Sequence, residues 1–184
     1  MFVTLHHCRI ELLQGDLSLQ AVDAIANAAN PQLAGGGGVD GAIHRGAGPE
    51  LLQETDRLYP NGCPVGSAVA TSGGCLPARY VFHAVGPVWH GGHEGEPALL
   101  AGAYRRCLEL AVERNCQSLA FPAISTGVYG YPKREAARVA LQTTLDFLRE
   151  FQRPSLVRFV LFDGGSLQIF ADVLAQLMSG SPLP

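Results

Sequence analysis

An aspartate beside a run of four glycines is the feature of this sequence best suited to chemistry. Gly35 to Gly38 are consecutive glycines, and Asp40 stands two positions after the run. Glycines carry no side chain, so they let backbone N–H groups approach a bulky anion such as a phosphate. A carboxylate beside a bound anion would be repelled unless it had a task of its own. The pattern therefore raises two questions: whether this loop holds a nucleotide, and whether Asp40 does chemistry on it.

A second loop, at residues 124–132, strengthens the interpretation as a phosphate site. It reads Ile-Ser-Thr-Gly-Val-Tyr-Gly-Tyr-Pro and leads from a predicted strand to a helix that begins at Pro132. The free N–H groups of the helix start and the hydroxyls of Ser125 and Thr126 are expected to face a crevice. Two such loops can grip a diphosphate from both sides.

Two common nucleotide motifs do not fit. Gly36, Gly38 and Gly41 match G-x-G-x-x-G, but the preceding strand ends near Ala28, about eight residues too early for a tight strand-to-helix turn. No acid follows a second strand to hold a ribose. A Walker loop is excluded because the chain has no Gly-Lys pair.

Stretches typical of strands and helices alternate around these loops. The predicted strands are residues 9–14, 22–28, 67–71, 80–85, 118–123 and 156–162, and the predicted helices are residues 40–47, 49–58, 97–114, 132–149 and 167–178. This order predicts an α/β fold, a three-layer α/β/α sandwich with a central mixed, mainly parallel sheet. Ligands of such sheets bind outside the carboxyl ends of the strands, where both loops fall.

Composition describes an ordinary globular protein. The chain has 184 residues, 47% hydrophobic and 16% charged, with a formal net charge of −3. We expect a single domain over residues 1–184, with an ordered core at about 4–178 and a frayed tail at 179–184. The negative charge argues against a protein held on nucleic acid by bulk electrostatics, so nucleic acid is possible as a partner but not indicated.

The five cysteines show no C-x-x-C spacing, and no secretory signal is visible, so we expect reduced thiols and a cytoplasmic protein. No apolar stretch reaches membrane-spanning length. His90 and His93 do not form a closed ligand set, so we expect no metal. Nothing calls for a cofactor, and a monomer is the expectation for one compact domain.

A set of motifs resembles one family. Asn30 is followed after six residues by Gly37-Gly38-Val39-Asp40, and Gly-Val-Tyr-Gly occupies 127–130. The segments Gln-Gly-Asp, Asn-Ala-Ala-Asn-Pro, Ala-Ile-His-Arg, His-Ala-Val-Gly-Pro-Val-Trp and Phe-Pro-Ala-Ile-Ser-Thr-Gly also follow in order. The chain resembles macrodomains, specifically the MacroD-type subclass that includes bacterial O-acetyl-ADP-ribose deacetylases. The resemblance covers roughly residues 10–177, and position 17 is Leu where the family often has Ile.

The resemblance implies ADP-ribose as the ligand. Asp16 then accepts the exocyclic amino hydrogen of adenine, the N–H of Leu17 faces a ring nitrogen, and Phe162 stacks on the base. The implied ligand-binding residues are Asp16, Leu17, Asn27, Gly37, Gly38, Val39, Ser125, Thr126, Gly127, Val128, Tyr129 and Phe162. The implied catalytic residues are Asp40 and Asn30, which lie beside the distal ribose, while Asn27 supports the loop.

The resemblance also implies a reaction, hydrolysis of an ester at the distal ribose. The ester joins the ribose to an acetyl group in O-acetyl-ADP-ribose, or to an Asp or Glu side chain of an ADP-ribosylated protein. Asp40 either takes the proton of the attacking water, or orients the ribose while a substrate phosphate oxygen holds the water. A non-catalytic ADP-ribose reader and a regulator that binds a ribonuclease or RNA remain as alternative functions.

Simpler roles are also open for single residues. Asp40 can cap the short helix that follows it, a common position for Asp. His83 lies within a predicted strand and is expected to be a satisfied core or rim histidine rather than a catalyst.

Overall fold

All the strands within residues 1–180 join one mixed sheet. The computed structural model describes residues 1–180, and within them the strand order is β1-β2-β7-β6-β3-β5-β4. The bounds are β1 Phe2–Leu5, β2 Cys8–Gln14, β3 Ala24–Ala28, β4 Ser67–Ser72, β5 Tyr80–Val85, β6 Ser118–Phe121 and β7 Leu156–Leu161. The five inner strands, β2, β7, β6, β3 and β5, run parallel to one another. The edge strands β1 and β4 pair antiparallel with β2 and β5. The predicted mixed, mainly parallel sheet is confirmed.

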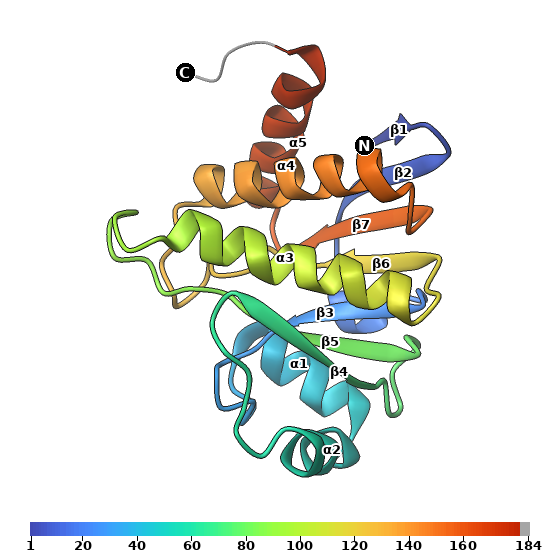
Figure 1. Ribbon diagram of the computed structural model, residues 1–184, viewed down its shortest axis with the longest axis vertical. Coiled ribbons are helices and arrows are strands. Elements are labelled where there is room, and N and C mark those ends of the chain that lie inside the picture. The colour runs from blue at the N-terminus through green and yellow to red at the C-terminus, as the bar shows by residue number, and fades with distance from the viewer. Residues whose placement is uncertain (181–184) are drawn as a thin grey trace.

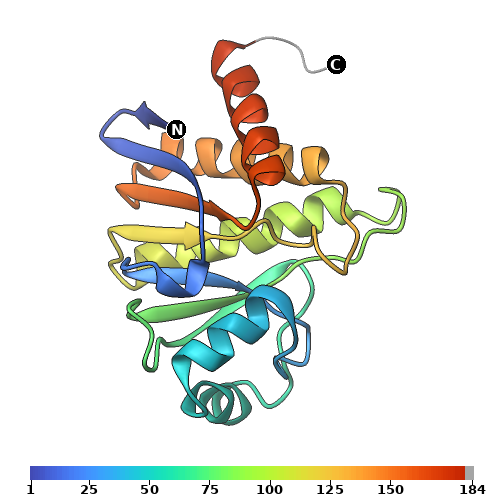
Figure 2. The same cartoon turned by 180° about the vertical axis from the view of Figure 1, so that it is seen from behind.

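Helices cover both faces of this sheet. Their bounds are α1 Gly38–Ala47, α2 Glu50–Leu58, α3 Glu96–Glu113, α4 Lys133–Phe151 and α5 Gly164–Ser179, and a 3₁₀ turn, η1, spans Leu17–Leu19. The larger core lies between the sheet and α3, α4 and α5 (Figure 1). A smaller core lies on the opposite face beneath α1 and α2 (Figure 2). The three-layer α/β/α prediction is therefore confirmed.

The larger core is organised by aromatic rings. Tyr104 of α3 packs against Phe121 of β6 at 5.0 Å between ring centroids. Phe159 of β7 lies 5.5 Å from Phe121 and 5.6 Å from Phe170 of α5. Rings at these separations add edge and offset-stacking attraction to the burial of their apolar area. This cluster fixes the central strands whose carboxyl ends carry the loops.

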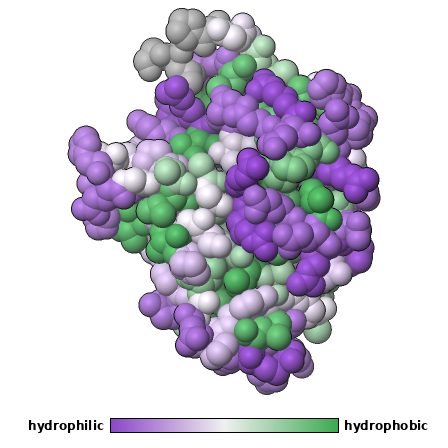
Figure 3. Space-filling view, viewed as in Figure 1, coloured by the Kyte–Doolittle hydropathy of each residue, from purple (hydrophilic) through white to green (hydrophobic). Residues whose placement is uncertain are grey.

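The outer surface of α3 and α4 is mainly hydrophilic, with a smaller hydrophobic area toward the side where the loop before α3 projects (Figure 3). Among the described residues, no helix combines the length and the apolar character that crossing a membrane would require.

Three elements differ from the predictions. Strand β1 was not predicted, because its residues alternate in exposure at a sheet edge and Phe2 remains 58% exposed. Helix α5 begins at Gly164, before the predicted start at 167, because the Asp163 side chain accepts a hydrogen bond from the N–H of Ser166 and caps it. Of the tail predicted to fray, Ser179 is the last residue of α5, and residues 181–184 lie outside the described residues.

Candidate active site

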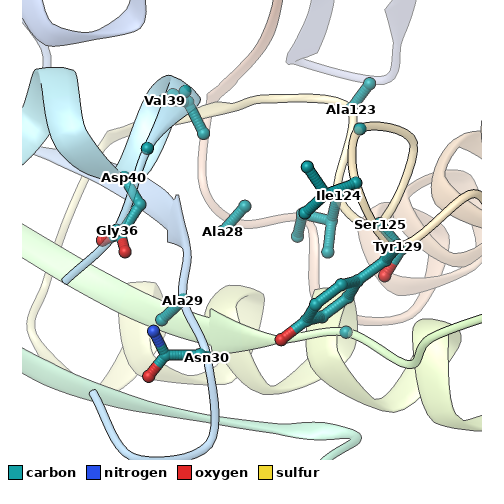
Figure 4. Close-up of a pocket in the computed structure, with 15 residues that line it drawn as sticks. Ala28, Ala29, Asn30, Gly36, Val39, Asp40, Ala123, Ile124, Ser125 and Tyr129 are labelled. Atoms are coloured by element: carbon teal, nitrogen blue, oxygen red, sulfur yellow. The ribbon is translucent and has the colours of Figure 1, made fainter. Parts of the chain in front are cut away.

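A cleft opens at the carboxyl ends of the central strands. Its volume is about 340 Å³. Asp40 and Asn30 lie on one side of it, and Ile124, Ser125 and Tyr129 lie on the other (Figure 4). The residues that line it are Ala28, Ala29, Asn30, Gly36, Gly37, Gly38, Val39, Asp40, Gly86, Ala123, Ile124, Ser125, Gly127, Val128 and Tyr129.

The glycine run forms one wall of the cleft and leads into α1. Gly37 is the N-cap of α1 and makes no side-chain capping bond, so the first N–H groups of the helix remain available. Gly38 has a φ of +57°, which favours glycine, and open space surrounds the position its Cβ would take. This wall therefore combines free N–H donors with room for an anion.

The opposite wall is a strained loop. Ser125 has a φ of +67°, and its buried hydroxyl has no hydrogen-bond partner within residues 1–180. A side chain at Gly86 would collide with Oγ of Ser125 and with Cγ2 of Ile124, so the loop needs glycine behind it. Positive φ in a non-glycine residue and an unpaired buried hydroxyl both mark functional positions.

Asp40 is buried in the first turn of α1, and its two carboxylate oxygens have different surroundings. Oδ1 accepts a hydrogen bond of 2.7 Å from Nδ2 of Asn27 and lies 3.3 Å from Nε2 of His44. Oδ2 has no hydrogen-bond partner in the described part of the chain, and a Cβ at Gly36 would lie 3.2 Å from it. The simpler role of Asp40 as a helix cap is wrong, because Gly37 occupies that position.

A chain of buried polar groups continues behind Asp40. Nδ2 of Asn27 lies 3.3 Å from Nδ1 of His83, and Nε2 of His83 lies 2.8 Å from Oγ1 of Thr71. Burial, with a smaller contribution from the nearby His44, lowers the pKa of His83 to about 3. His83 is therefore a hydrogen-bonded core histidine, as expected from its strand position.

Asn30 supports its own loop. Its Nδ2 donates to the backbone oxygen of Gly35 at 2.8 Å, and its Oδ1 accepts from the N–H of Ala34 at 3.1 Å. One amide hydrogen and one lone pair are left over for a ligand. The side chain thus holds the loop in shape while it lines the cleft.

The three residues expected at adenine lie outside the cleft lining, at the ends of two neighbouring strands. Asp16 follows β2 and caps η1 by accepting from the N–H and the hydroxyl of Ser18. Leu17 is buried in that turn. Phe162 follows β7, and its side chain is 90% exposed. The N–H of Gly15 donates to the oxygen of Leu161 at 3.0 Å, which joins the two strand ends.

Nine of the predicted ligand-binding and catalytic residues line the cleft, and five do not. Those outside the lining are Asp16, Leu17, Asn27, Thr126 and Phe162. Sequence reasoning missed His44, although its position four residues after Asp40 on a helix was a usable signal. It also missed Thr71 and Gly86, because their contacts with His83 and with Ser125 form only when the chain is folded.

A glycine wall at a helix start, a second loop and a buried acid at the strand ends define a nucleotide-type anion site in an α/β sandwich. The sequence model of the Macro domain family matches residues 26–140. The chain is 51% identical over 170 residues to an O-acetyl-ADP-ribose deacetylase of Enterobacter cloacae, covering 91% of this chain and 94% of that one. This protein belongs to the macrodomain family.

Two solved macrodomains have the same fold. The macrodomain of Oceanobacillus iheyensis with ADP superposes with a TM-score of 0.93 at 42% identity, over 98% of this chain and 97% of that one. The Trypanosoma brucei macrodomain in complex with ADP-ribose gives 0.83 at 43% identity, over 89% of this chain and 68% of that one.

Proposed function

We propose that this protein binds ADP-ribose and hydrolyses esters at its distal ribose. The substrates are O-acetyl-ADP-ribose and proteins that carry one ADP-ribose on an Asp or Glu side chain. The observation that carries the proposal is Asp40 in the cleft, with Oδ1 held by Asn27 and Oδ2 unpaired within residues 1–180. The activity named for the Enterobacter cloacae relative supports it.

In the proposed complex the diphosphate lies between the two loops. The N–H groups at the start of α1 favour an anion, and the unpaired hydroxyl of Ser125 can donate to a phosphate oxygen. The adenine lies at the ends of β2 and β7. There the exposed ring of Phe162 can stack on it, and a free oxygen of Asp16 can accept its amino hydrogen.

In the proposed reaction a water molecule attacks the acyl carbon of the ester. Oδ2 of Asp40 takes a proton from that water as its oxygen bonds to the acyl carbon. The bond between the acyl carbon and the ribose oxygen then breaks, the ribose oxygen takes the proton back from Asp40, and the carboxylic acid formed loses its own proton to solvent. The products are ADP-ribose and acetate, or ADP-ribose and the free side-chain carboxylate. Asn30 holds the distal ribose through the hydrogen and lone pair that its loop leaves unused.

The test is single-turnover release of ADP-ribose from a glutamate-linked ADP-ribosylated protein. Asp40→Asn keeps the shape of the side chain but removes the base, so we expect a rate at least about a hundredfold lower. Calorimetry should find ADP-ribose binding retained in this variant. Asp146→Asn, on the exposed face of α4, is the control and should keep the wild-type rate.

Two results would overturn the proposal. An undiminished rate in Asp40→Asn would remove the assigned role of Asp40. Binding of ADP-ribose with no turnover by the wild type of either ester would instead favour the reader function.

A further inference from the structure

Four polar side chains form a connected line beneath the cleft, crossing from one edge of the sheet to α1. The line runs from Thr71 of β4 through His83 of β5 and Asn27 of β3 to Asp40, with separations of 2.8, 3.3 and 2.7 Å. None of the four is more than 6% exposed. Because burying polar groups costs free energy even when they are paired, an apolar set of side chains would be the simpler way to fill this space.

The acid at the end of the line fixes the direction of every hydrogen bond in it. A carboxylate oxygen can only accept, so Asn27 must turn its amide nitrogen toward Oδ1 of Asp40. The second hydrogen of that nitrogen is then available to Nδ1 of His83, which must accept it. The proton of the neutral ring is therefore on Nε2, which donates to Oγ1 of Thr71.

The other states of His83 would break the line. In the opposite tautomer, an N–H of the ring and an N–H of Asn27 would face each other across 3.3 Å. A protonated ring would create the same conflict, because both of its nitrogens donate. Burial holds the pKa of His83 at about 3, so the ring stays neutral at ordinary pH. Asn27 thus selects the tautomer with the proton on Nε2, and Thr71 stabilises that tautomer because its hydroxyl accepts from the buried Nε2–H.

We propose that Thr71 and His83 are positioning residues for the hydrolysis. Thr71 holds the ring of His83 in place by accepting from Nε2, His83 holds the amide of Asn27 by accepting its second hydrogen, and Asn27 occupies Oδ1 of Asp40 so that Oδ2 is the oxygen left to take the proton. This inference rests on the proposed function, in which Asp40 is the base. Neither residue lines the cleft and neither is more than 3% exposed, so both act on the substrate only through their neighbours.

The main test is Thr71→Val, which removes the hydroxyl and keeps the branched shape. We expect the single-turnover rate to fall about tenfold, as small misplacements of reacting groups do, with the Kd for ADP-ribose unchanged. Thr71→Ser should restore most of the rate. The control is Thr144→Val on α4, which removes a buried hydroxyl that donates to the oxygen of Ala140 at 2.8 Å and should leave the rate unchanged.

Two further measurements separate positioning from general stability. Nitrogen-15 NMR of the His83 ring should show one tautomer, protonated on Nε2, in the wild type and a mixture in Thr71→Val. In the background of Asp40→Asn, adding Thr71→Val should cause no further loss of rate, because its effect passes through Asp40.

The outcomes distinguish this inference from the proposed function. Full activity of Asp40→Asn would overturn the proposed function and, with it, this inference. An inactive Asp40→Asn beside a fully active Thr71→Val would overturn the inference alone. A full tenfold loss in the Asp40→Asn background, or the same loss in Thr144→Val, would also contradict it.

Discussion

At the scale of single residues, the atoms without partners gather at one place. Within residues 1–180, the side-chain nitrogen and oxygen atoms that are fully buried and lack a hydrogen bond are Oδ1 of Asn27 and Oγ of Ser125. Both lie at the cleft or directly beneath Asp40. Buried polar atoms in folded proteins nearly always find a partner, so unpaired ones indicate where a ligand or water completes the structure. The gathering of unpaired atoms supports the cleft as the binding site.

The proposed adenine position gives a prediction at a single side chain. Phe162 is 90% exposed, so Phe162→Ala should change the free energy of unfolding by less than about 0.5 kcal/mol. Stacking of an aromatic ring on a base is worth roughly 1–3 kcal/mol, so calorimetry should find ADP-ribose binding weakened by at least about fivefold. Binding of ribose 5-phosphate, which has no base, should not change.

The control for this prediction is Phe2→Ala, which removes another exposed ring, on the distant edge strand β1. It should bind both ligands as the wild type does. Equal weakening of ADP-ribose and ribose 5-phosphate by Phe162→Ala would contradict the stacking role.

At the scale of elements, the second wall of the cleft depends on the loop that precedes α3. The backbone N–H of Trp89 donates to the backbone oxygen of Tyr129 at 2.9 Å. The ring centroid of Trp89 lies 4.5 Å from that of Tyr131. The carboxylate of Glu96, which is almost fully buried, accepts from the N–H groups of three residues of this loop. These are His90, Gly92 and Glu94. Glu96 thus orders the loop itself, and Trp89 connects the loop to the wall.

Glu96 gives a prediction about pH. Burial raises the pKa of its carboxyl, but the backbone N–H donors outweigh burial and lower the pKa from 4.5 to about 2. A pKa below that of the unfolded chain means that the stabilisation is complete above pH 4.5 and is lost as pH falls toward 2. Glu96→Gln should therefore be less stable than the wild type at pH 7, with a difference that shrinks below pH 4.5.

Urea unfolding of the two proteins at pH 7, 4.5 and 3 measures this difference. Other carboxylates with lowered pKa values, such as Asp23 and Asp163, are present in both proteins and cancel in the comparison. A difference that stays constant across the three pH values would show that the ionised carboxylate of Glu96 does not hold the loop.

The strands, helices and loops around the site could be predicted from the sequence to different degrees. The central strands and long helices were predictable because their apolar patterns report burial directly, as at Tyr80–Val85. The two loops proposed to hold the diphosphate were predictable because glycine runs and helix starts commonly bind anions. The Thr71–His83 contact joins antiparallel edge and central strands, and only the sheet register brings these side chains together.

The role of Glu96 is a second feature that the sequence could not predict. Its three donors come from a polar, glycine-rich stretch that has no periodic pattern. The sequence therefore predicted a loop but not the side chain that orders it. Similarly, the exposed β1 carries too few buried residues to give a strand signal.

At the scale of the whole molecule, the cores on the two faces share one sheet. β6 contributes Leu119 and Phe121 to the larger core and Ala120 to the smaller one. A third, small cluster containing Cys63 and Val85 lies near the end of β5. Because the central strands β3, β5, β6 and β7 each contribute to more than one cluster, loss of one cluster should remove support for the others. We propose that the chain unfolds as a single cooperative domain.

The cysteines provide a test of this proposal, because they sample separate parts of the interior. All five are free, and only Cys75 is exposed. Burial raises the pKa of the other four thiols, that of Cys116 to about 11, and only the thiolate reacts quickly. Ellman's reagent should therefore titrate one thiol in the native protein, none in Cys75→Ser, and five in denaturant.

The four buried cysteines lie in two different clusters. Cys63 lies in the small cluster, whereas Cys8, Cys107 and Cys116 lie in the larger core. In a single cooperative unit, all four should lose protection at one urea midpoint, which should coincide with that seen by circular dichroism. If Cys63 reacted at lower urea than the other three, the region around the cleft would be a separate unfolding unit.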